Sequence, residues 1–352
     1  MAPIFLATNN NAIQPIIALT FSAAKSKAIL RDVVIKLAQW LGFKASPPEV
    51  DMAPEILVAG VLALDDLKTP YESRKGIVGG AGIYSSIASS MFAQTALVAA
   101  KGNDFPRQII DMIKSKNINI ESVKELDYPT FHWSGEYVDD MAQAITHETN
   151  FEINEHYDWE IVNKHKKPKV LLLCNNDPNI QKKVLEQTRS ELIAMDTMNL
   201  WINIESKMLD YVVSKVNILF INDAEAKLYS KEEELDKAAE ILLKKGPEFV
   251  IIKKGEHGAS LYTNEIKKHL RAFKIKKFVD PTGAGDSFAG AAMGYIANCG
   301  KLDVKSLINA MNYGAAVASV TVEGFGTESI EKINLKEIET RFQQLNGGPG
   351  RI

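Results

Sequence analysis

Short apolar runs recur along the chain from residue 55 onward, each with the length of a buried strand. They occupy residues 55–64, 95–100, 169–174, 191–196, 216–222 and 249–254. The segments between them have apolar residues at helical spacing, as in 82–93, 106–116, 178–188 and 236–246. Strands that alternate with helices favour a largely parallel sheet covered by helices on both faces. The pattern therefore predicts an open α/β sandwich, with ligands at the carboxyl edge of its sheet.

One interval departs from this alternation. Residues 127–155 are rich in aromatic and β-branched residues and lack a long apolar stripe at helical spacing, which predicts two or three short strands. Together with residues 65–75, they are expected to form a small sheet over the carboxyl edge of the main sheet. Such a lid would keep water away from an activated group. The alternative is a surface hairpin with no gating role.

Composition narrows the class of protein. The chain has 352 residues, of which 46% are hydrophobic and 24% charged, as in globular proteins. This length suits one large domain plus a smaller one, or two ordinary domains. The formal net charge of -3 and the pI of about 6.1 provide no basic field for nucleic acid or an anionic membrane. Neither is expected as a partner.

Cys174 and Cys299 are the two cysteines of the sequence, and they form no CxxC pair. This usage fits a reducing cytoplasm and argues against a disulfide framework or a zinc site. The six histidines form no HExxH motif. A metal ion is therefore expected to have oxygen ligands.

The first 54 residues are predicted to be an N-terminal extension of uncertain role. Residues 1–31 carry basic residues and no acid, a bias also found in organellar presequences. The apolar run AIQPIIALTF is too short to span a bilayer. The stretch ILRDVVIKLAQWLGF instead favours an ordinary extension that contains an amphipathic helix.

The stretch VDPTGAGDSFAGA, which begins at Val279, holds two aspartates apart with small residues. Apolar residues at helical spacing follow Asp286, so a buried helix is expected to begin near Gly285. The unpaired N–H groups and the dipole of a helix N-terminus attract anions, most often phosphate. The alternative is a tight turn with one aspartate as an N-cap, which accounts for one acid and leaves the other unexplained.

This pattern resembles the C-terminal signature of the ribokinase-like (PfkB) carbohydrate kinases. The resemblance implies that Asp286 is the catalytic base and that the amides of Gly283, Ala284 and Gly285 form an anion hole. It also implies a ribokinase-like three-layer sandwich over residues 55–345, with a mainly parallel central sheet and a small β lid. ATP and Mg²⁺ are the cofactors that it implies.

Further positions match the acceptor site of this family. Asp65 comes five residues after Gly60, where the family has an acid that accepts hydrogen bonds from substrate hydroxyls. Asp65 is preferred to Asp66 for this role, and a turn or capping role is the alternative. Gly79 and Gly80 match a di-glycine motif whose backbone approaches the sugar.

The segment after the di-glycine motif departs from the family pattern. Many members have Asn where Tyr84 stands, and ribokinases have Lys at the position of Ala81. Ribose is therefore not inferred as the acceptor.

The same segment contains GxGxxS at 80–85, which imitates a dinucleotide motif. An NAD-dependent dehydrogenase is a weak alternative, because no acidic residue directly ends the next predicted strand.

Two residue pairs are candidates for cation binding. Asn222 and Glu225 have the NxxE spacing with which the family organises magnesium and its waters. The alternative for this pair is a helix start with a capping box. Asp280 and Thr282 stand where some members bind a monovalent cation, which makes K⁺ a candidate activator.

The nucleotide is expected near two C-terminal segments. Lys253, Gly255 and Gly258 lie in a strand-turn-strand segment that borders the nucleotide in this family, although a solvated strand edge is the alternative. Asn312 lies on a helix with small residues that could admit an adenine ring. Dense helix packing explains those small residues equally well.

Together these features predict an ATP-dependent phosphotransferase that moves the γ-phosphoryl group to a hydroxyl of a sugar, polyol or nucleoside. Phe131, Trp133 and Tyr137 in the lid offer faces for a sugar or nucleoside ring, without distinguishing among these acceptors. The alternative is a non-catalytic nucleotide-binding or sugar-binding sensor of the same fold. The expected partner is a small molecule, and two copies could form a homodimer through the lid.

Overall fold

The computed structural model describes residues 53–138 and 144–347. Of the expected N-terminal extension, residues 1–52 lie outside the described residues, and with them the presequence and amphipathic-helix alternatives. No helix within the described ranges has the length and apolar character needed to cross a bilayer.

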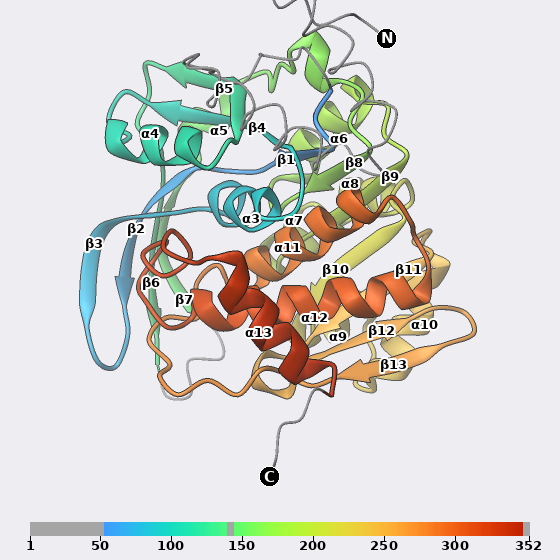
Figure 1. Ribbon diagram of the computed structural model, residues 1–352. Coiled ribbons are helices and arrows are strands. Elements are labelled where there is room, and N and C mark those ends of the chain that lie inside the picture. Colours follow the sequence, from blue (N-terminus) through green and yellow to red (C-terminus); the bar gives the residue numbers. More distant parts are fainter. Residues whose placement is uncertain (1–52, 139–143, 348–352) are drawn as a thin grey trace, which may run out of the picture. The chain divides into compact units, whose positions relative to one another are not determined.

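The central sheet has nine strands among the described residues (Figure 1). In sheet order they are β13 (Lys267–Leu270), β12 (Ala259–Tyr262), β11 (Phe249–Lys253), β10 (Ile218–Asn222), β9 (Leu192–Asp196), β8 (Val170–Leu173), β1 (Ile56–Ala59), β4 (Thr95–Gly102) and β5 (Asn119–Leu126). From β11 to β5, neighbouring strands run parallel, and β12 and β13 form an antiparallel edge. The predicted mainly parallel sheet is confirmed.

Helices cover both faces of this sheet and give it three layers. On one face lie α3 (Ala81–Ser90), α4 (Arg107–Ser115), α11 (Ala284–Cys299), α12 (Val304–Thr321) and α13 (Leu335–Leu345). On the other lie α5 (Glu152–Glu155), α6 (Pro178–Gln187), α7 (Asn199–Ile204), α8 (Ser206–Val213), α9 (Asp223–Ser230) and α10 (Leu235–Lys244). Two short 3-10 helices, η1 (Asn163–His165) and η2 (Gly255–His257), lie in connecting segments.

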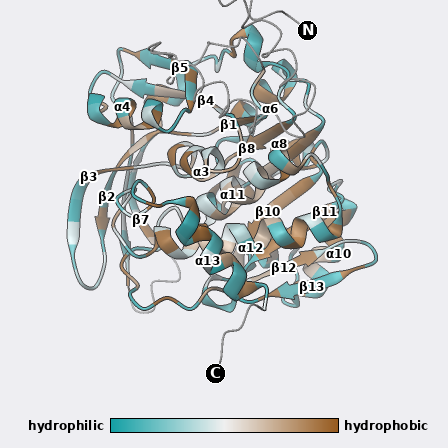
Figure 2. Ribbon diagram, in the orientation of Figure 1, coloured by the Kyte–Doolittle hydropathy of each residue, from teal (hydrophilic) through white to brown (hydrophobic). Residues whose placement is uncertain are grey.

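The continuous apolar runs of the sequence follow from this layering. In β1, Ile56 and Val58 enter one core, while Leu57 and Ala59 enter the other, because successive side chains of a strand point to opposite faces. Figure 2 shows central strands such as β8 and β10 as hydrophobic, whereas much of the outer helix α13 is hydrophilic.

A second, four-stranded sheet contains the two segments predicted to form the lid, and its gating role stays a prediction. Its order is β3 (Ser73–Gly79), β2 (Ala63–Lys68), β6 (Phe131–Tyr137) and β7 (Ala144–Asn150). The pair β2 and β6 is parallel, and both outer pairs are antiparallel. The two segments predicted for the lid therefore pair with each other (Figure 1). The first continues to Gly79, and the second ends in α5, which returns to the main body.

Candidate active site

The predicted anion hole lies at the N-terminus of α11. Gly283 is the N-cap residue and has a φ of 75°, a left-handed conformation that strains residues with a side chain. Among the described residues, nothing accepts the N–H of Gly283 or Gly285, whereas the N–H of Ala284 donates to the Pro281 carbonyl at 3.2 Å. Two unpaired amides at the start of a 16-residue helix suit an anion.

Asp286 occupies the first turn of the same helix. Burial and, after it, the charge of Asp196 raise the pKa of Asp286 to about 6, although the ammonium of Lys253 acts in the opposite direction. A carboxylate with this pKa is ionised at neutral pH and can still accept a proton effectively. The Oγ of Ser85 donates to the Asp286 carbonyl at 3.0 Å, which joins α11 to α3.

Lys253 ends β11 and forms an ion pair with Asp196, which ends β9. Burial lowers the pKa of the Lys253 ammonium, but the carboxylates of Asp196 and Glu225 raise it above its usual value, so the side chain stays charged. A Cβ atom on Gly285 would lie 3.0 Å from the Lys253 Nζ. The ammonium therefore lies beside the first turn of α11. The neighbouring Lys254 is not part of this arrangement, because its Nζ donates to the Ser260 Oγ at 2.8 Å.

Asp65 lies on β2 of the lid with 4% of its surface exposed. Burial raises its pKa well above the usual value, and the charges of Asp280 and Asp286 raise it further. No hydrogen bond from the described residues reaches its carboxylate. Asp66 points elsewhere and accepts the N–H of Gly76 at 2.8 Å. The preference for Asp65 over Asp66 agrees with these orientations.

The di-glycine motif brings the backbone close to the lid strand β2 and to the segment that joins β1 to β2. A Cβ atom on Gly79 would overlap the Asp65 carboxylate. Gly80 has a φ of 97°, and a Cβ atom there would lie 2.5 Å from the Val61 carbonyl. A side chain is therefore excluded at Gly80 by the backbone, and at Gly79 it would displace the Asp65 carboxylate. The predicted contact of these glycines with the acceptor stays a prediction.

Asp280 is fully buried and joins two loops. Its carboxylate accepts the N–H of Thr282 at 2.8 Å and the N–H of Gly326 at 3.1 Å. The Oγ1 of Thr282 also donates to the Tyr137 hydroxyl of the lid at 3.4 Å. These bonds fix the loop before α11, and the monovalent-cation role of Asp280 and Thr282 stays a prediction.

Asn222 and Glu225 form a capping box at the start of α9. The Asn222 Oδ1 accepts the N–H of Glu225 at 2.8 Å, and the Glu225 Oε2 accepts the N–H of Asn222 at 2.9 Å. Burial raises the pKa of Glu225 to about 7. The capping alternative is thus present, and the magnesium role stays a prediction. Oxygen donors at the carboxyl end of a strand fit the chemistry of Mg²⁺.

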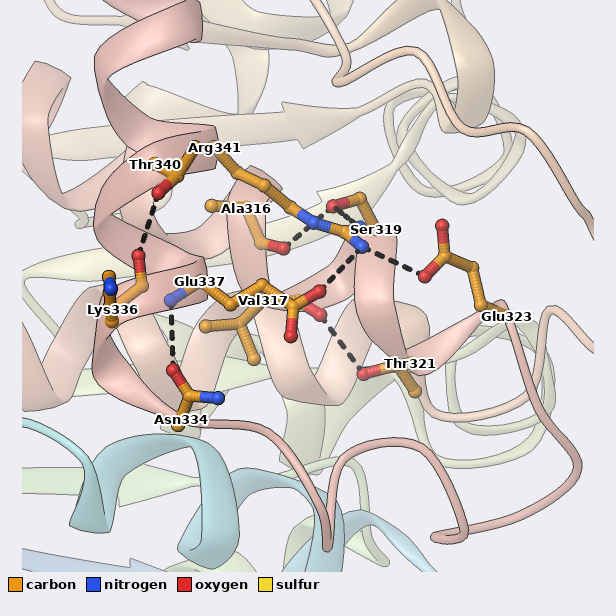
Figure 3. Close-up of polar contacts among 10 residues, drawn as sticks. All are labelled: Ala316, Val317, Ser319, Thr321, Glu323, Asn334, Lys336, Glu337, Thr340 and Arg341. Atoms are coloured by element: carbon orange, nitrogen blue, oxygen red, sulfur yellow. Dashed lines mark hydrogen bonds and ion pairs between the residues drawn. The ribbon is translucent and has the colours of Figure 1, made fainter.

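The predicted adenine contact, Asn312, lies on α12 and is bonded to the C-cap residue of α13. Its Nδ2 donates to the Asn346 Oδ1 at 2.7 Å. Farther along α12, the Arg341 guanidinium of α13 donates to the Ser319 Oγ at 2.8 Å and to Glu323 at 2.9 Å (Figure 3). Packing of α13 accounts for the small Ser319 side chain on this face. The adenine role of Asn312 stays a prediction.

Gly255 and Gly258 form the turn between β11 and β12 with φ values of 52° and 84°. These left-handed conformations explain why glycine occupies both positions. Their predicted place beside the nucleotide stays a prediction.

Three residues that the sequence already marks have further contacts in the structure. Asp196, which ends an apolar run, forms an ion pair with Lys253. Tyr137 was expected to offer a ring face, but the structure also brings its hydroxyl to Thr282. Tyr84, which marked a departure from the family pattern, lies against Gly283.

Residues 65–333 match the family model described as pfkB family carbohydrate kinase. The chain belongs to this family. It is therefore a kinase that transfers a phosphoryl group from ATP to an alcohol group. Two relatives align over most of their length. The cytidine kinase of Thermococcus kodakarensis is 28% identical over 67% of this chain and 86% of its own. The nucleoside kinase of Methanocaldococcus jannaschii is 25% identical over 73% of this chain and 83% of its own.

Solved structures of pfkB-type kinases share the fold. The M. jannaschii nucleoside kinase superposes with a TM-score of 0.67 at 22% identity, covering 83% of this chain and 99% of its own. The ribokinase of Thermotoga maritima gives a TM-score of 0.66 at 25% identity, covering 82% and 99%. The Burkholderia thailandensis nucleoside kinase, solved with inosine, gives 0.67 at 18% identity, covering 83% and 99%. The predicted ribokinase-like sandwich is confirmed.

Proposed function

We propose that Asp286 removes the proton from an acceptor hydroxyl bound under the lid. The amides of Gly283 and Gly285 would hold the oxygens of the transferring phosphoryl group, and the amide of Ala284 would join them on release from Pro281. The observation that carries this proposal is that Asp286, with its raised pKa, lies on the same helical turn as the unpaired amides. Base and anion site on one turn align the nucleophile with the phosphoryl group.

The nucleotide end of the site would lie along the carboxyl edge from β10 to β11. ATP supplies the phosphoryl group, and Mg²⁺ neutralises its charge. Asn222 and Glu225 would hold magnesium through water, and Lys253 would neutralise phosphate oxygens near Gly285. The described residues contain no group of three or more His, Cys, Asp or Glu arranged as a metal site, and magnesium held through water and phosphates needs none.

The nucleoside part of ATP would lie farther along this edge. Gly255 and Gly258 would border it, since neither residue has a side chain against which the nucleotide could clash. Asn312 would contact the adenine after exchanging its bond to Asn346.

The acceptor would be a sugar, a polyol or a nucleoside that Asp65 binds through its hydroxyls, with Gly79 and Gly80 at close approach. A buried carboxylate that lacks a hydrogen bond among the described residues supports this role, because two hydroxyl donors can satisfy it. Two relatives are named cytidine kinase and nucleoside kinase, so a nucleoside stays among the proposed acceptors.

Two further assignments complete the proposal. K⁺ would activate the enzyme from a site beside Asp280 and Thr282. Two copies would pair through the lid, where Tyr71 on the β2–β3 turn is 79% exposed and Ile145 on the outer strand β7 is 49% exposed. A cytoplasmic location stays a prediction from cysteine usage.

The decisive experiment measures ATP consumption with a panel of sugars, polyols and nucleosides, with Mg²⁺ present and with or without K⁺. We expect one acceptor class to stimulate ADP release and to yield a phosphorylated product. A sensor of the same fold would be stabilised thermally by ATP and Mg²⁺ yet release no ADP with any acceptor. If NAD stabilised the protein thermally and ATP did not, both the kinase and the nucleotide-binding sensor would be contradicted.

A further inference from the structure

Tyr84 lies on α3 with its whole side chain inside the protein. It is 1% exposed, and its hydroxyl meets no hydrogen-bond partner among the described residues. Buried polar groups are paired in the great majority of cases. An unpaired hydroxyl beside an active site therefore points to a partner that arrives with a ligand.

The ring of Tyr84 lies between the anion hole and the acceptor site. A Cβ atom on Gly283 would lie 2.5 Å from three atoms of this ring, so the ring packs against the N-cap of α11. A Cβ atom on Gly79 would lie 3.8 Å from the Tyr84 Cε2 and would overlap the Asp65 carboxylate. One side chain thus borders both Gly283 and the place where Asp65 meets the di-glycine motif.

The Tyr84 hydroxyl is protonated and can donate a hydrogen bond. Burial, followed by the negative charges of Asp280, Asp65 and Asp286, raises the pKa of Tyr84 well above its usual value, so the phenol stays protonated. The Tyr137 hydroxyl also lies nearby and acts in the same direction. Ionised carboxylates only accept hydrogen bonds, whereas a phenol can donate one. An alcohol both donates and accepts hydrogen bonds, so it suits a site that contains accepting carboxylates and a donating phenol.

We propose that the Tyr84 hydroxyl donates a hydrogen bond to a hydroxyl oxygen of the acceptor and thereby selects which acceptors bind. The proposal rests on the proposed function and deepens it. With Asp65 accepting from one hydroxyl and Tyr84 donating to another, the site would prefer a ring with neighbouring hydroxyls, as in a sugar, a cyclic polyol or the ribose of a nucleoside.

The test compares Tyr84→Phe with Tyr157→Phe. The Tyr157 hydroxyl is bonded to the carbonyls of Ser122 and Glu160 at 3.3 and 3.1 Å, so its loss should lower Tm and leave acceptor kinetics unchanged. For Tyr84→Phe we expect an unchanged or higher Tm and an unchanged KM for ATP. Its KM for the acceptor should rise by about three- to tenfold, which is the value of one neutral hydrogen bond. Its kcat should stay within about twofold, because the ring still covers Gly283.

Deoxy analogues of the acceptor sharpen the test. One analogue should lose activity with the wild type but lose nothing further with Tyr84→Phe, since both changes remove the same bond. An unchanged acceptor KM in Tyr84→Phe, or a fall in its Tm like that of Tyr157→Phe, would overturn the proposal.

Failure of the Tyr84 proposal can be distinguished from failure of the proposed kinase function. If the wild type transfers phosphoryl to no acceptor, the proposed function fails, and equilibrium binding of the same panel then tests Tyr84 alone. Weaker binding by Tyr84→Phe would support the proposal. Equal binding, or no binding by either protein, would overturn it.

Discussion

Lys253 and Asp196, 57 residues apart in sequence, form an ion pair where β11 and β9 end, beside the first turn of α11. The pair is held by parallel strands that flank β10. Its side chains are 17% and 4% exposed. Loss of Lys253 would leave the buried Asp196 carboxylate without its ion-pair partner, and loss of Asp196 would leave the buried Lys253 ammonium with the carboxylates of Glu225 and Asp286 but without its ion pair.

The first prediction concerns this pair. Asp196→Asn should lower the free energy of unfolding by about 3 kcal/mol, as expected when a buried pair loses one partner. Urea denaturation measures the change. The matched control is Asp158→Asn, whose partner Lys183 lies at 3.7 Å and is about half exposed, and which should cost less than about 1 kcal/mol. Equal effects of both variants would contradict the structural importance of the Lys253 pair.

Removal of the proposed base tests the chemistry directly. Asp286→Asn should reduce kcat by at least about a hundredfold and leave the Kd for ATP and Mg²⁺ nearly unchanged. Single-turnover ADP release and calorimetric titration measure the two quantities. The control is Asp303→Asn at the N-cap of α12, where Asn caps equally well. A near-normal rate in Asp286→Asn would exclude Asp286 as the base.

The raised pKa of Asp286 predicts opposite pH trends for activity and stability. The base must be ionised, so kcat/KM should rise with pH through about 6. Because the folded state holds this proton more tightly than the unfolded state, the contribution of Asp286 to stability falls as pH rises from about 4 to about 6. Asp286→Asn should therefore raise Tm at pH 8 and have less effect at pH 4. A Tm gain independent of pH would show that burial of the charge is not its cause.

The anion hole is better tested at Gly285 than at Gly283. A side chain at Gly283 would adopt a strained φ and strike the Tyr84 ring, so it would unfold the site as well as block it. A Cβ on Gly285 meets only the flexible end of Lys253 at 3.0 Å. We therefore expect Gly285→Ala to keep Tm within a few degrees. Its kcat should fall by about 10², because the added methyl group would displace the Lys253 ammonium and obstruct the phosphoryl oxygens at the amides. If Gly285→Ala kept full activity, the small residues 283–285 would serve only to form the turn.

Asp65 and Asp66 form a natural pair of test and control. Asp65→Ala should raise the KM for the acceptor at least about tenfold, with little change in the KM for ATP, because two hydroxyl bonds are lost. Asp66→Ala removes the bond to the Gly76 N–H and should affect hairpin stability without affecting the acceptor KM. If Asp65→Ala weakens ATP and acceptor equally, Asp65 is structural.

The sequence predicted the sheet and lid because each left a local signal. Runs such as residues 170–174 are apolar at every position, as expected for strands buried on both faces. The polar partners of the site were less predictable. NxxE is the spacing of a capping box as well as of a magnesium motif, so Asn222 and Glu225 give the same pattern for both. The surroundings of the Tyr84 hydroxyl depend on α11 and on the lid strand β6, which are far from it in sequence.

The strand β2 lies inside the lid, paired with β3 on one side and β6 on the other, and it also carries Asp65. A lid built in this way cannot shift without moving the carboxylate proposed to bind the acceptor. Closure of the lid and binding of the acceptor are then coupled. Acceptor binding favours the closed lid by the same free energy by which closure favours acceptor binding. Substitutions at the far edge of the lid, in β7, would therefore change acceptor affinity without touching the acceptor.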